Sequence, residues 1–203
     1  MTKLFNVIPN LEMPKEITIV GSSRIILKKK LGKEIDESDF IVRFNFANTH
    51  DYKEFTGKKT SLMVINNHVY TSLEKKLKNN DKIKQYLVIS PSKLKKFESN
   101  MIVFFFERKI KQFLLLFKFI KYSDIFFDLV SILIRKNFSV GFCFILLALA
   151  SNLKIRIFGF DLNEDMKKRK HYYKKQKIGD VHDLTAEHKV LKKIENLGLL
   201  TFY

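Results

Sequence analysis

The sequence of 203 residues is poor in the residues that form linkers and disulfides, with 7 glycines, 3 prolines and one cysteine. So little of the chain has linker character that a single domain over residues 1–203 is the simplest expectation. The lone Cys143 excludes a disulfide within the chain and fits a reducing compartment. Its apolar surroundings, Phe142–Ala150, predict a buried, inert thiol rather than a nucleophile.

Targeting segments are also missing from the sequence. The N-terminus lacks the basic start, apolar centre and small-residue cleavage site of a signal peptide. No run approaches the roughly 20 apolar residues that span a bilayer. The best candidate, Ser139–Ala150, predicts a buried helix instead. We therefore expect a soluble, cytoplasmic protein, with peripheral association at the inner membrane face as an open alternative.

Acidic residues are few relative to basic ones, and the formal net charge is +17. The positive electrostatic potential of such a chain favours phosphates, nucleotides, nucleic acid or an anionic membrane as partners. Lysine runs such as Lys28–Lys30 also fit plain solvated surface, and the abundance of Lys, Ile, Phe and Asn fits a biased genome. The basic, amphipathic stretch Phe104–Leu133 fits either a helical pair packed on a sheet or a membrane-surface face.

Short apolar runs alternate with lysine-bearing helical stretches, which is typical of an α/β fold with a mostly parallel central sheet flanked by helices. Strands are predicted at Ile17–Val20, Phe40–Phe44, Ser61–Ile65, Tyr86–Ser90, Ile102–Phe106, Lys154–Phe158 and Leu199–Phe202. Helices are predicted at Ser23–Leu31, Thr71–Asn79, Ser92–Phe97, Arg108–Lys121, Ile125–Arg135, Val140–Asn152 and Leu184–Leu197.

Small residues form two turns between predicted strands and helices. Gly21-Ser22-Ser23 follows the first strand, and Ser139-Val140-Gly141 precedes the apolar helix. Glycine permits close backbone approach, and the amides at a helix N-terminus attract phosphate. N-capping alone also explains Ser139.

Polar residues and glycine follow further strands. Arg43 and Asn45 end the second strand, and the ends of adjacent parallel strands face one crevice. Asn45 offers a donor and an acceptor to a ribose or phosphate, although an ordinary turn residue is the alternative. Gly159-Phe160-Asp161 ends a later strand, where glycine admits a flat ligand close to the backbone.

Two histidines, His171 and His182, lie in polar segments after the last core strand. An imidazole with a pKa of about 6.5 takes a proton from a hydroxyl at neutral pH. A second histidine, or a tyrosine hydroxyl, neutralises charge on a departing phosphate. Glu187 falls in the first turn of the final helix, where it supports the helix or orients its neighbours. A metal site is a poorer hypothesis because the five histidines are scattered.

Together these segments resemble the sialyltransferases of glycosyltransferase family 29. The family's long motif has the pattern V-V-G-N-S, G-x-E-I-D-x-x-D-F-V-x-R-x-N-x-A and then D-x-G-x-x-T; its other motifs are S-T-G with Y-G-F, H-Y-Y, and H-x-x-x-x-E. The similar segments here, in family order, are Ile19–Ser23, Gly32–Ala47, Phe55–Thr60, Ser139–Gly141 with Ile157–Phe160, His171–Tyr173, and His182 with Glu187.

The resemblance implies a Rossmann-like domain of the GT-A-variant type, with CMP-sialic acid as donor and a glycan or glycolipid as acceptor. It implies an inverting reaction without a metal or other cofactor, and no nucleic acid as partner. His182 falls on the general base and His171 on the residue facing the CMP phosphate. The candidate substrate-binding residues are Gly21, Ser22, Ser23, Asn45, Ser139, Val140, Gly141, Gly159, Phe160, Asp161, Tyr172 and Tyr173. The two tyrosines are included because the similar sialyltransferases of family 42 use tyrosines at the leaving group.

Some positions depart from the family pattern. Ser22 replaces the first CMP-binding Asn, and Val140 replaces the Thr of S-T-G. The inter-motif disulfide cannot form, which is consistent with a bacterial or viral relative. His171 and His182 are closer than in many relatives, which leaves an exchange of their roles open. The alternatives are a nucleotide-binding homologue without activity, another CMP-linked sugar such as a Kdo-like acid, and a basic nucleic-acid-binding module.

Overall fold

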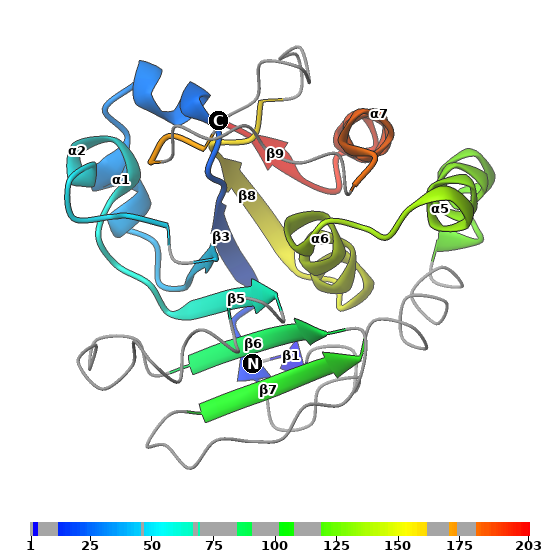
Figure 1. The fold of residues 1–203 in the computed structure, drawn as a ribbon, viewed down its shortest axis with the longest axis horizontal. Helices are drawn as coiled ribbons and strands as arrows, with labels where there is room; N and C mark the ends of the chain where they lie inside the picture. The colour runs from blue at the N-terminus through cyan, green and yellow to red at the C-terminus, as the bar shows by residue number, and fades with distance from the viewer. Residues whose placement is uncertain are drawn as a thin grey trace.

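The computed structural model describes residues 2–3, 12–45, 47–66, 69, 85–90, 102–107, 119–161, 171–173 and 182–203. Within these ranges, seven strands form one sheet in the order β7-β6-β5-β4-β3-β8-β9, with every neighbouring pair parallel (Figure 1). They are β3 (Glu16–Val20), β4 (Ile41–Phe44), β5 (Leu62–Asn66), β6 (Gln85–Ser90), β7 (Ile102–Glu107), β8 (Lys154–Phe158) and β9 (Thr201–Phe202). A further antiparallel pair is formed by β1 (Thr2–Lys3) and β2 (Glu12–Met13). The predicted α/β fold with a parallel sheet is confirmed.

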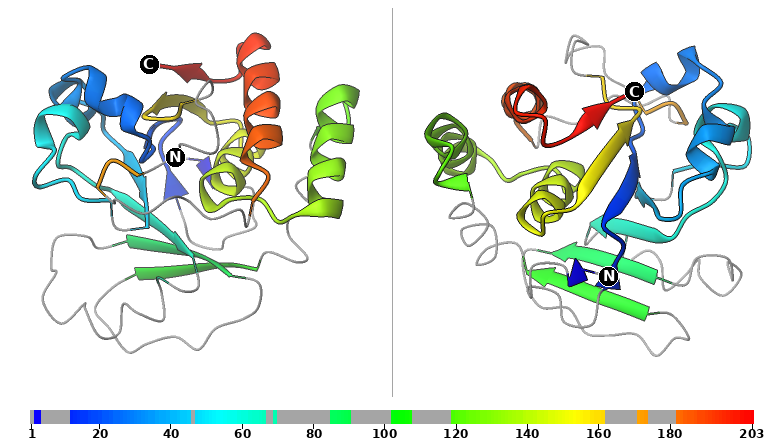
Figure 2. Two further views of the ribbon diagram at one scale, coloured as in Figure 1. Left: turned by 45° about the horizontal axis from the view of Figure 1, so that its top comes forward. Right: turned by 180° about the vertical axis from the view of Figure 1, so that it is seen from behind.

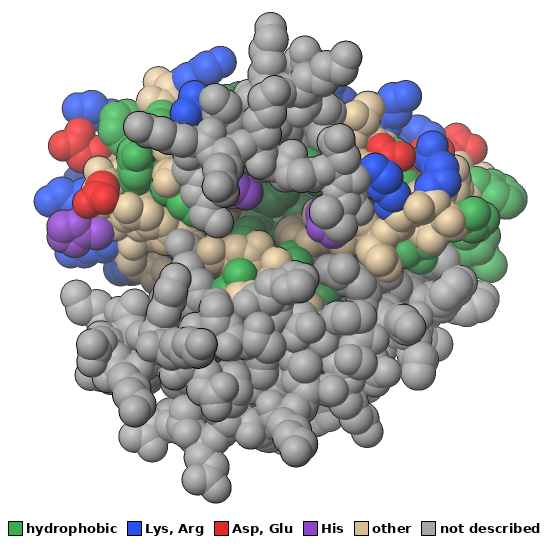
Figure 3. All heavy atoms as spheres, in the orientation of Figure 1, with side chains coloured by type: hydrophobic (Ala, Val, Ile, Leu, Met, Phe, Trp, Pro, Cys, Tyr) green, Lys and Arg blue, Asp and Glu red, His purple; other side chains and the backbone are tan. Residues whose placement is uncertain are grey.

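The strand order reverses at β3. Val20 at its end pairs with Arg43 of β4 on one side and with Phe158 of β8 on the other. The chain runs outward from β3 to β7 and then returns to the opposite side of β3 with β8. Such a reversal opens a crevice at the carboxyl ends of the strands. Apolar and histidine side chains gather in the middle of the face shown in Figure 3.

Helices cover both faces of the sheet (Figure 1, Figure 2). One face carries the 3₁₀ helix η1 (Arg24–Lys28), α1 (Gly32–Asp36) and α2 (Lys53–Thr56), and the other carries α5 (Ser123–Arg135), α6 (Val140–Ala150) and α7 (Leu184–Asn196). The predictions for the last three helices are confirmed to within a few residues. The predicted helices at Thr71–Asn79 and Ser92–Phe97, and most of that at Arg108–Lys121, lie outside the described residues.

The helix predicted over Ser23–Leu31 is wrong in type and length. The structure has five residues of 3₁₀ helix and begins a separate helix at Gly32. Ile25 and Ile26 are β-branched, which lowers helix propensity. The 3₁₀ helix ends at Lys28, directly before Lys29, which has extended backbone.

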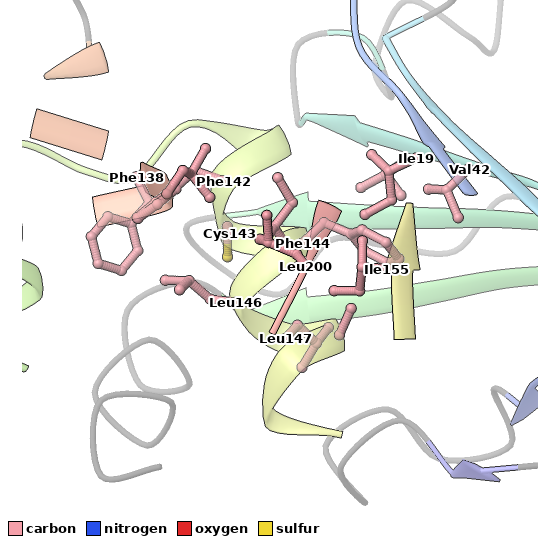
Figure 4. Close-up of a cluster of buried hydrophobic side chains, with 14 of the residues drawn as sticks. Ile19, Val42, Phe138, Phe142, Cys143, Phe144, Leu146, Leu147, Ile155 and Leu200 are labelled. Atoms are coloured by element: carbon pink, nitrogen blue, oxygen red, sulfur yellow. The ribbon is translucent and has the colours of Figure 1, made fainter. Parts of the chain in front are cut away.

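Helix α6 lies in the centre of the larger core. Its side chains from Phe142 to Ala148 are all buried, and a helix that is apolar on every side is stable only inside a protein. Figure 4 shows Phe144 and Leu147 of α6 beside Ile19 and Ile155 of the sheet. Cys143 is fully buried, as predicted. No helix in the described part of the chain is both long and apolar enough to span a membrane.

Arg43 is a buried cation on the opposite face of the sheet. Its Nε donates to the carbonyl of Lys59 at 2.9 Å and its Nη2 to the carbonyl of Thr56 at 2.7 Å. Burial lowers the pKa of Arg43 to about 10, so it stays charged at neutral pH. The expectation that Arg43 faces the crevice is therefore wrong. Side chains alternate along a strand, and it is the neighbouring Phe44 that reaches the cavity.

Asp36 holds the same turn from a second direction. Its carboxylate accepts hydrogen bonds from the amides of Lys58, at 2.9 and 3.0 Å, and Lys59, at 2.9 Å. Gly57 between the bonded groups has a φ of 68°, a conformation that favours glycine. Asp36 and Arg43 of the long motif thus have a structural role, which is to fix the turn between α2 and β5.

Candidate active site

A cavity of about 400 Å³ opens at the carboxyl ends of β3, β4, β5 and β8, beside the N-terminus of α6. This size falls within the range of small-molecule sites. Histidine and apolar side chains are visible on this face in Figure 3. The cavity is lined by every predicted site residue except Tyr172 and Tyr173, and additionally by Phe44, Asn66, Phe142, Leu184, Glu187, His188 and Leu191.

The first wall is a tight pairing of two turns. The amide of Gly21 donates to Phe158 at 2.7 Å, and that of Ser23 donates to Gly159 at 3.0 Å. A Cβ on Gly21 would lie 2.5 Å from the carbonyl oxygen of Gly159 and 2.5 Å from the ring of Phe160. Only glycine fits there without displacing the other turn. The turn at Gly21–Ser23 and the turn at Gly159–Asp161 are therefore one structural unit.

Asn45 presents one half of its amide group to the cavity. Its φ of 47° places it in the left-handed region, and its Oδ1 accepts a hydrogen bond from the amide of Asn66 at 3.1 Å. That bond engages the acceptor oxygen and leaves Nδ2 to donate. A donor at this position suits a ribose or phosphate oxygen.

Ser139 is fully engaged as a structural cap. Its amide and hydroxyl both donate to the carboxylate of Glu187, each at 2.6 Å. Its Oγ also accepts from the amide of Phe142 at 3.2 Å, which caps α6. Because both donors of Ser139 are committed, the amides of Val140 and Gly141 in the first helical turn are the groups suited to an anion.

His182 lies immediately before α7. Its Nδ1 is 2.9 Å from the carbonyl oxygen of Asn137. A carbonyl only accepts, so Nδ1 carries the proton and Nε2 is the basic nitrogen of the neutral ring. Asp183 caps α7 by accepting from the amide of Ala186 at 3.1 Å, which fixes the backbone next to this imidazole.

His171 also lines the cavity and lies against the first glycine turn. Its Nδ1 is 2.5 Å from Oγ of Ser22, and residues 23 and 171 form an isolated antiparallel bridge. The next residue, Tyr172, is buried, and its hydroxyl donates to the carbonyl of Asn48 at 2.9 Å. Burial raises the pKa of Tyr172 to about 12. Tyr172 therefore anchors the segment that carries His171 and does not contribute to the cavity wall.

Some lining residues were missed by the sequence analysis. His188 is 9% exposed and lies on the cavity side of α7 with Leu184 and Leu191. The spacing 184, 188, 191 marks one face of a helix, so periodicity could have identified them. Asn66, which also lines the cavity, ends β5 beside the strand that Asn45 follows. No group of three or more His, Cys, Asp or Glu side chains with metal-binding geometry occurs among the described residues.

The chain matches the sequence model described as "Glycosyltransferase family 29 (sialyltransferase)" over residues 10–199. This protein belongs to glycosyltransferase family 29. The family-29 chain is 43% identical over 54 residues to "Beta-galactoside alpha-2,6-sialyltransferase 2" of Xenopus tropicalis, a stretch that covers 27% of this chain and 10% of the frog protein. It is 34% identical over 71 residues to "Sialyltransferase-like protein 2" of Arabidopsis thaliana, covering 35% of this chain and 16% of the plant protein.

Solved structures show that the fold is shared over almost the whole chain. A mammalian sialyltransferase in complex with Gal-beta-1-3GalNAc-ortho-nitrophenol has a TM-score of 0.62 at 16% identity and covers 98% of this chain and 76% of that chain. The sialyltransferase CstII from Campylobacter jejuni, in complex with a substrate analogue, cytidine-5'-monophosphate, has a TM-score of 0.53 at 15% identity and covers 95% and 80% of the two chains. At these identities the likeness concerns the fold.

Proposed function

We propose that this family-29 protein is an inverting, metal-independent glycosyltransferase that transfers sialic acid from CMP-sialic acid to a hydroxyl of a glycan or glycolipid. The observation that carries this proposal is the cavity. It joins two small-residue turns to His171 and His182, although these segments are far apart in the sequence.

The donor fits the cavity by its charge and shape. CMP-sialic acid carries a phosphate and a carboxylate, which suit a chain of net charge +17. The amides of Val140 and Gly141 and the Nδ2 of Asn45 supply neutral donors for its oxygens. Phe44 and Phe160, whose rings meet edge to face at 6.3 Å, provide an apolar surface for the flat or hydrophobic parts.

The two histidines divide the chemistry between them. The acceptor hydroxyl attacks the anomeric carbon from the face opposite CMP, so one C–O bond forms as the bond to the phosphate oxygen breaks. The hydroxyl proton goes to Nε2 of His182. CMP leaves as a phosphate monoester, and His171 stabilises the charge on the departing oxygen. Attack from the opposite face inverts the anomeric configuration.

Release of CMP tests the proposal directly. The protein is incubated with CMP-sialic acid, with and without galactoside acceptors, and free CMP and sialylated product are measured. We expect CMP release that depends on the acceptor and matches product formation. CMP binding without transfer would identify an inactive homologue instead. Binding of DNA or RNA with a steep salt dependence, and no binding of CMP or its sugars, would contradict an enzyme altogether.

We also propose that α5 lies on an anionic membrane surface, at the inner membrane face. The helix buries Ile125, Leu129 and Ile132, so part of the segment packs on the protein as one hypothesis expected. Yet three large apolar side chains, spaced seven residues apart, are exposed: Ile120 by 58%, Phe127 by 67% and Ile134 by 79%. Basic side chains accompany them at Lys121, Arg135 and Lys136. Apolar insertion with basic flanks suits an anionic bilayer.

Vesicle sedimentation tests the membrane face. We expect the protein to bind vesicles that contain anionic phospholipid, and Phe127→Ser with Ile134→Ser to weaken binding by at least about 10-fold, because two inserted side chains are lost. Leu197→Ser, which removes a half-exposed apolar side chain outside α5, is the matched control. Equal binding by the wild type and the double variant would contradict the role of α5.

A further inference from the structure

Three contacts join His171 to the turn after β3. Residues 23 and 171 form the antiparallel bridge, and the amide of Tyr172 donates to the carbonyl of Ser22 at 3.0 Å. The side chains add a third contact, since Oγ of Ser22 is 2.5 Å from Nδ1 of His171. The backbone bonds fix where the histidine is, and the side-chain bond fixes which ring nitrogen faces Ser22.

Tyr173 completes the group from the other side. Its ring stacks on the imidazole of His171, with centroids 5.3 Å apart and planes at 11°. Burial raises the pKa of Tyr173. The imidazole is therefore held in position by stacking on its face and by the hydrogen bond to Ser22 at its edge.

A hydroxyl partner permits a tautomer that a carbonyl partner forbids. His182 faces the carbonyl of Asn137, which can only accept, so its Nδ1 must be protonated. His171 faces the hydroxyl of Ser22, which can donate, so its Nδ1 can be the unprotonated nitrogen. The partner of His182 thus dictates its tautomer, whereas the partner of His171 allows its Nδ1 either to accept or to donate.

We propose that Ser22 is a positioning residue that donates its hydroxyl proton to Nδ1 of His171 and so keeps an N–H at Nε2 for the departing phosphate. This inference rests on the proposed function. Ser22 stands where the family pattern has a CMP-binding Asn, and its side chain is committed to His171. In this chain, therefore, His171 and not residue 22 contacts the leaving group. The assignment also fixes the roles of the two histidines, because only His182 then presents a basic Nε2.

Nitrogen-15 NMR of the imidazole rings, with and without CMP, tests the tautomer without any need for activity. Resonances of His171 are identified by their loss in His171→Ala. We expect Nε2 to be protonated and Nδ1 unprotonated in the wild type with CMP, and a mixture of tautomers in Ser22→Ala. Ser22→Thr keeps the hydroxyl and should keep the wild-type tautomer. A protonated Nδ1 in the wild-type complex would overturn the proposal.

Kinetics test the same residue through the reaction. We expect Ser22→Ala to lower kcat about 10-fold with little change in KM for the donor, since it misorients a group worth roughly 100-fold or more. Ser22→Thr should recover most of this loss. Ser22→Ala combined with His171→Ala should be no worse than His171→Ala alone, because the two residues act as a unit. Additive losses would overturn the proposal.

Two experimental outcomes distinguish failure of this inference from failure of the proposed function. If no variant transfers sialic acid but the ring nitrogens behave as expected, the proposed function fails and the positioning role of Ser22 stands. If transfer is normal but Ser22→Ala leaves both the tautomer and kcat unchanged, the positioning role fails alone. Ser131→Ala, which removes an exposed hydroxyl on α5, controls for the loss of a serine elsewhere.

Discussion

His182→Ala is expected to lower the rate of sialyl transfer by at least about 100-fold, the scale of losing a general base. The reason is the fixed tautomer. The carbonyl of Asn137 holds the proton on Nδ1, and Nε2 is the nitrogen that can accept the acceptor's proton. Affinity for CMP should change little, since the groups assigned to CMP are His171, Asn45 and the amides of Val140 and Gly141, and not His182. Initial rates of product formation and calorimetric titration with CMP measure the two effects.

A matched histidine separates catalysis from a general effect on charge. His50 is almost fully exposed, with 98% of its side chain accessible, and it is not among the residues that line the cavity. His50→Ala should therefore transfer at the wild-type rate. Retention of more than about a tenth of wild-type activity by His182→Ala would show that the base lies elsewhere, because a positioned base contributes more than that. His171 would then be the next residue to test.

Glu187→Ala is expected to destabilise the fold by about 3 kcal/mol, because it leaves the amide and hydroxyl of Ser139 without their charged acceptor. Glu187 is only 1% exposed, so water replaces it poorly. The carboxylate also lies at the N-terminus of α6, where a negative charge is favourable. Urea denaturation of the two proteins measures the difference in the free energy of unfolding.

Two further substitutions define the cause of that loss. Glu187→Gln keeps an oxygen that can accept from the amide of Ser139 but lacks the second one, so we expect about half the destabilisation. Glu195→Ala removes another glutamate of α7, one with a single weak bond to the amide of Phe202 at 3.4 Å. It should cost less than about 1 kcal/mol. Equal losses in all three variants would indicate a general sensitivity of α7.

The sequence predicted the layers of the fold because local patterns determine them. The central strands β3, β4 and β5 are short, largely apolar runs, and α6 is apolar throughout its length, so these elements are visible without tertiary information. The glycine turn at Gly21 was visible for the same reason. The type and the ends of a helix were harder to predict where helix propensity is weak. This is the case in η1, whose Ile-Ile-Leu-Lys run fits more than one conformation.

The roles of individual polar residues depended on contacts that no local pattern contains. Ser22 and His171 are 149 positions apart, and Ser139 and Glu187 are 48 apart. Arg43 lies within β4 with its side chain away from the cavity, whereas Asn45 follows the strand with a φ of 47°, and the motif does not indicate this change of backbone conformation. Nothing in the composition indicates that Tyr172 is buried while its neighbour His171 reaches the cavity.

The position of β3 between β4 and β8 has a consequence for how the molecule folds. Residues 16–20 of β3 pair with residues 154–158 of β8. During synthesis, β3 therefore lacks this partner until more than a hundred further residues have been made. Pairings so distant in sequence slow folding, and until then one edge of β3 offers unpaired backbone groups to any other strand. A nascent chain that stops before β8 therefore has β3 as an exposed edge strand, prone to misassociation, and has no crevice for a substrate.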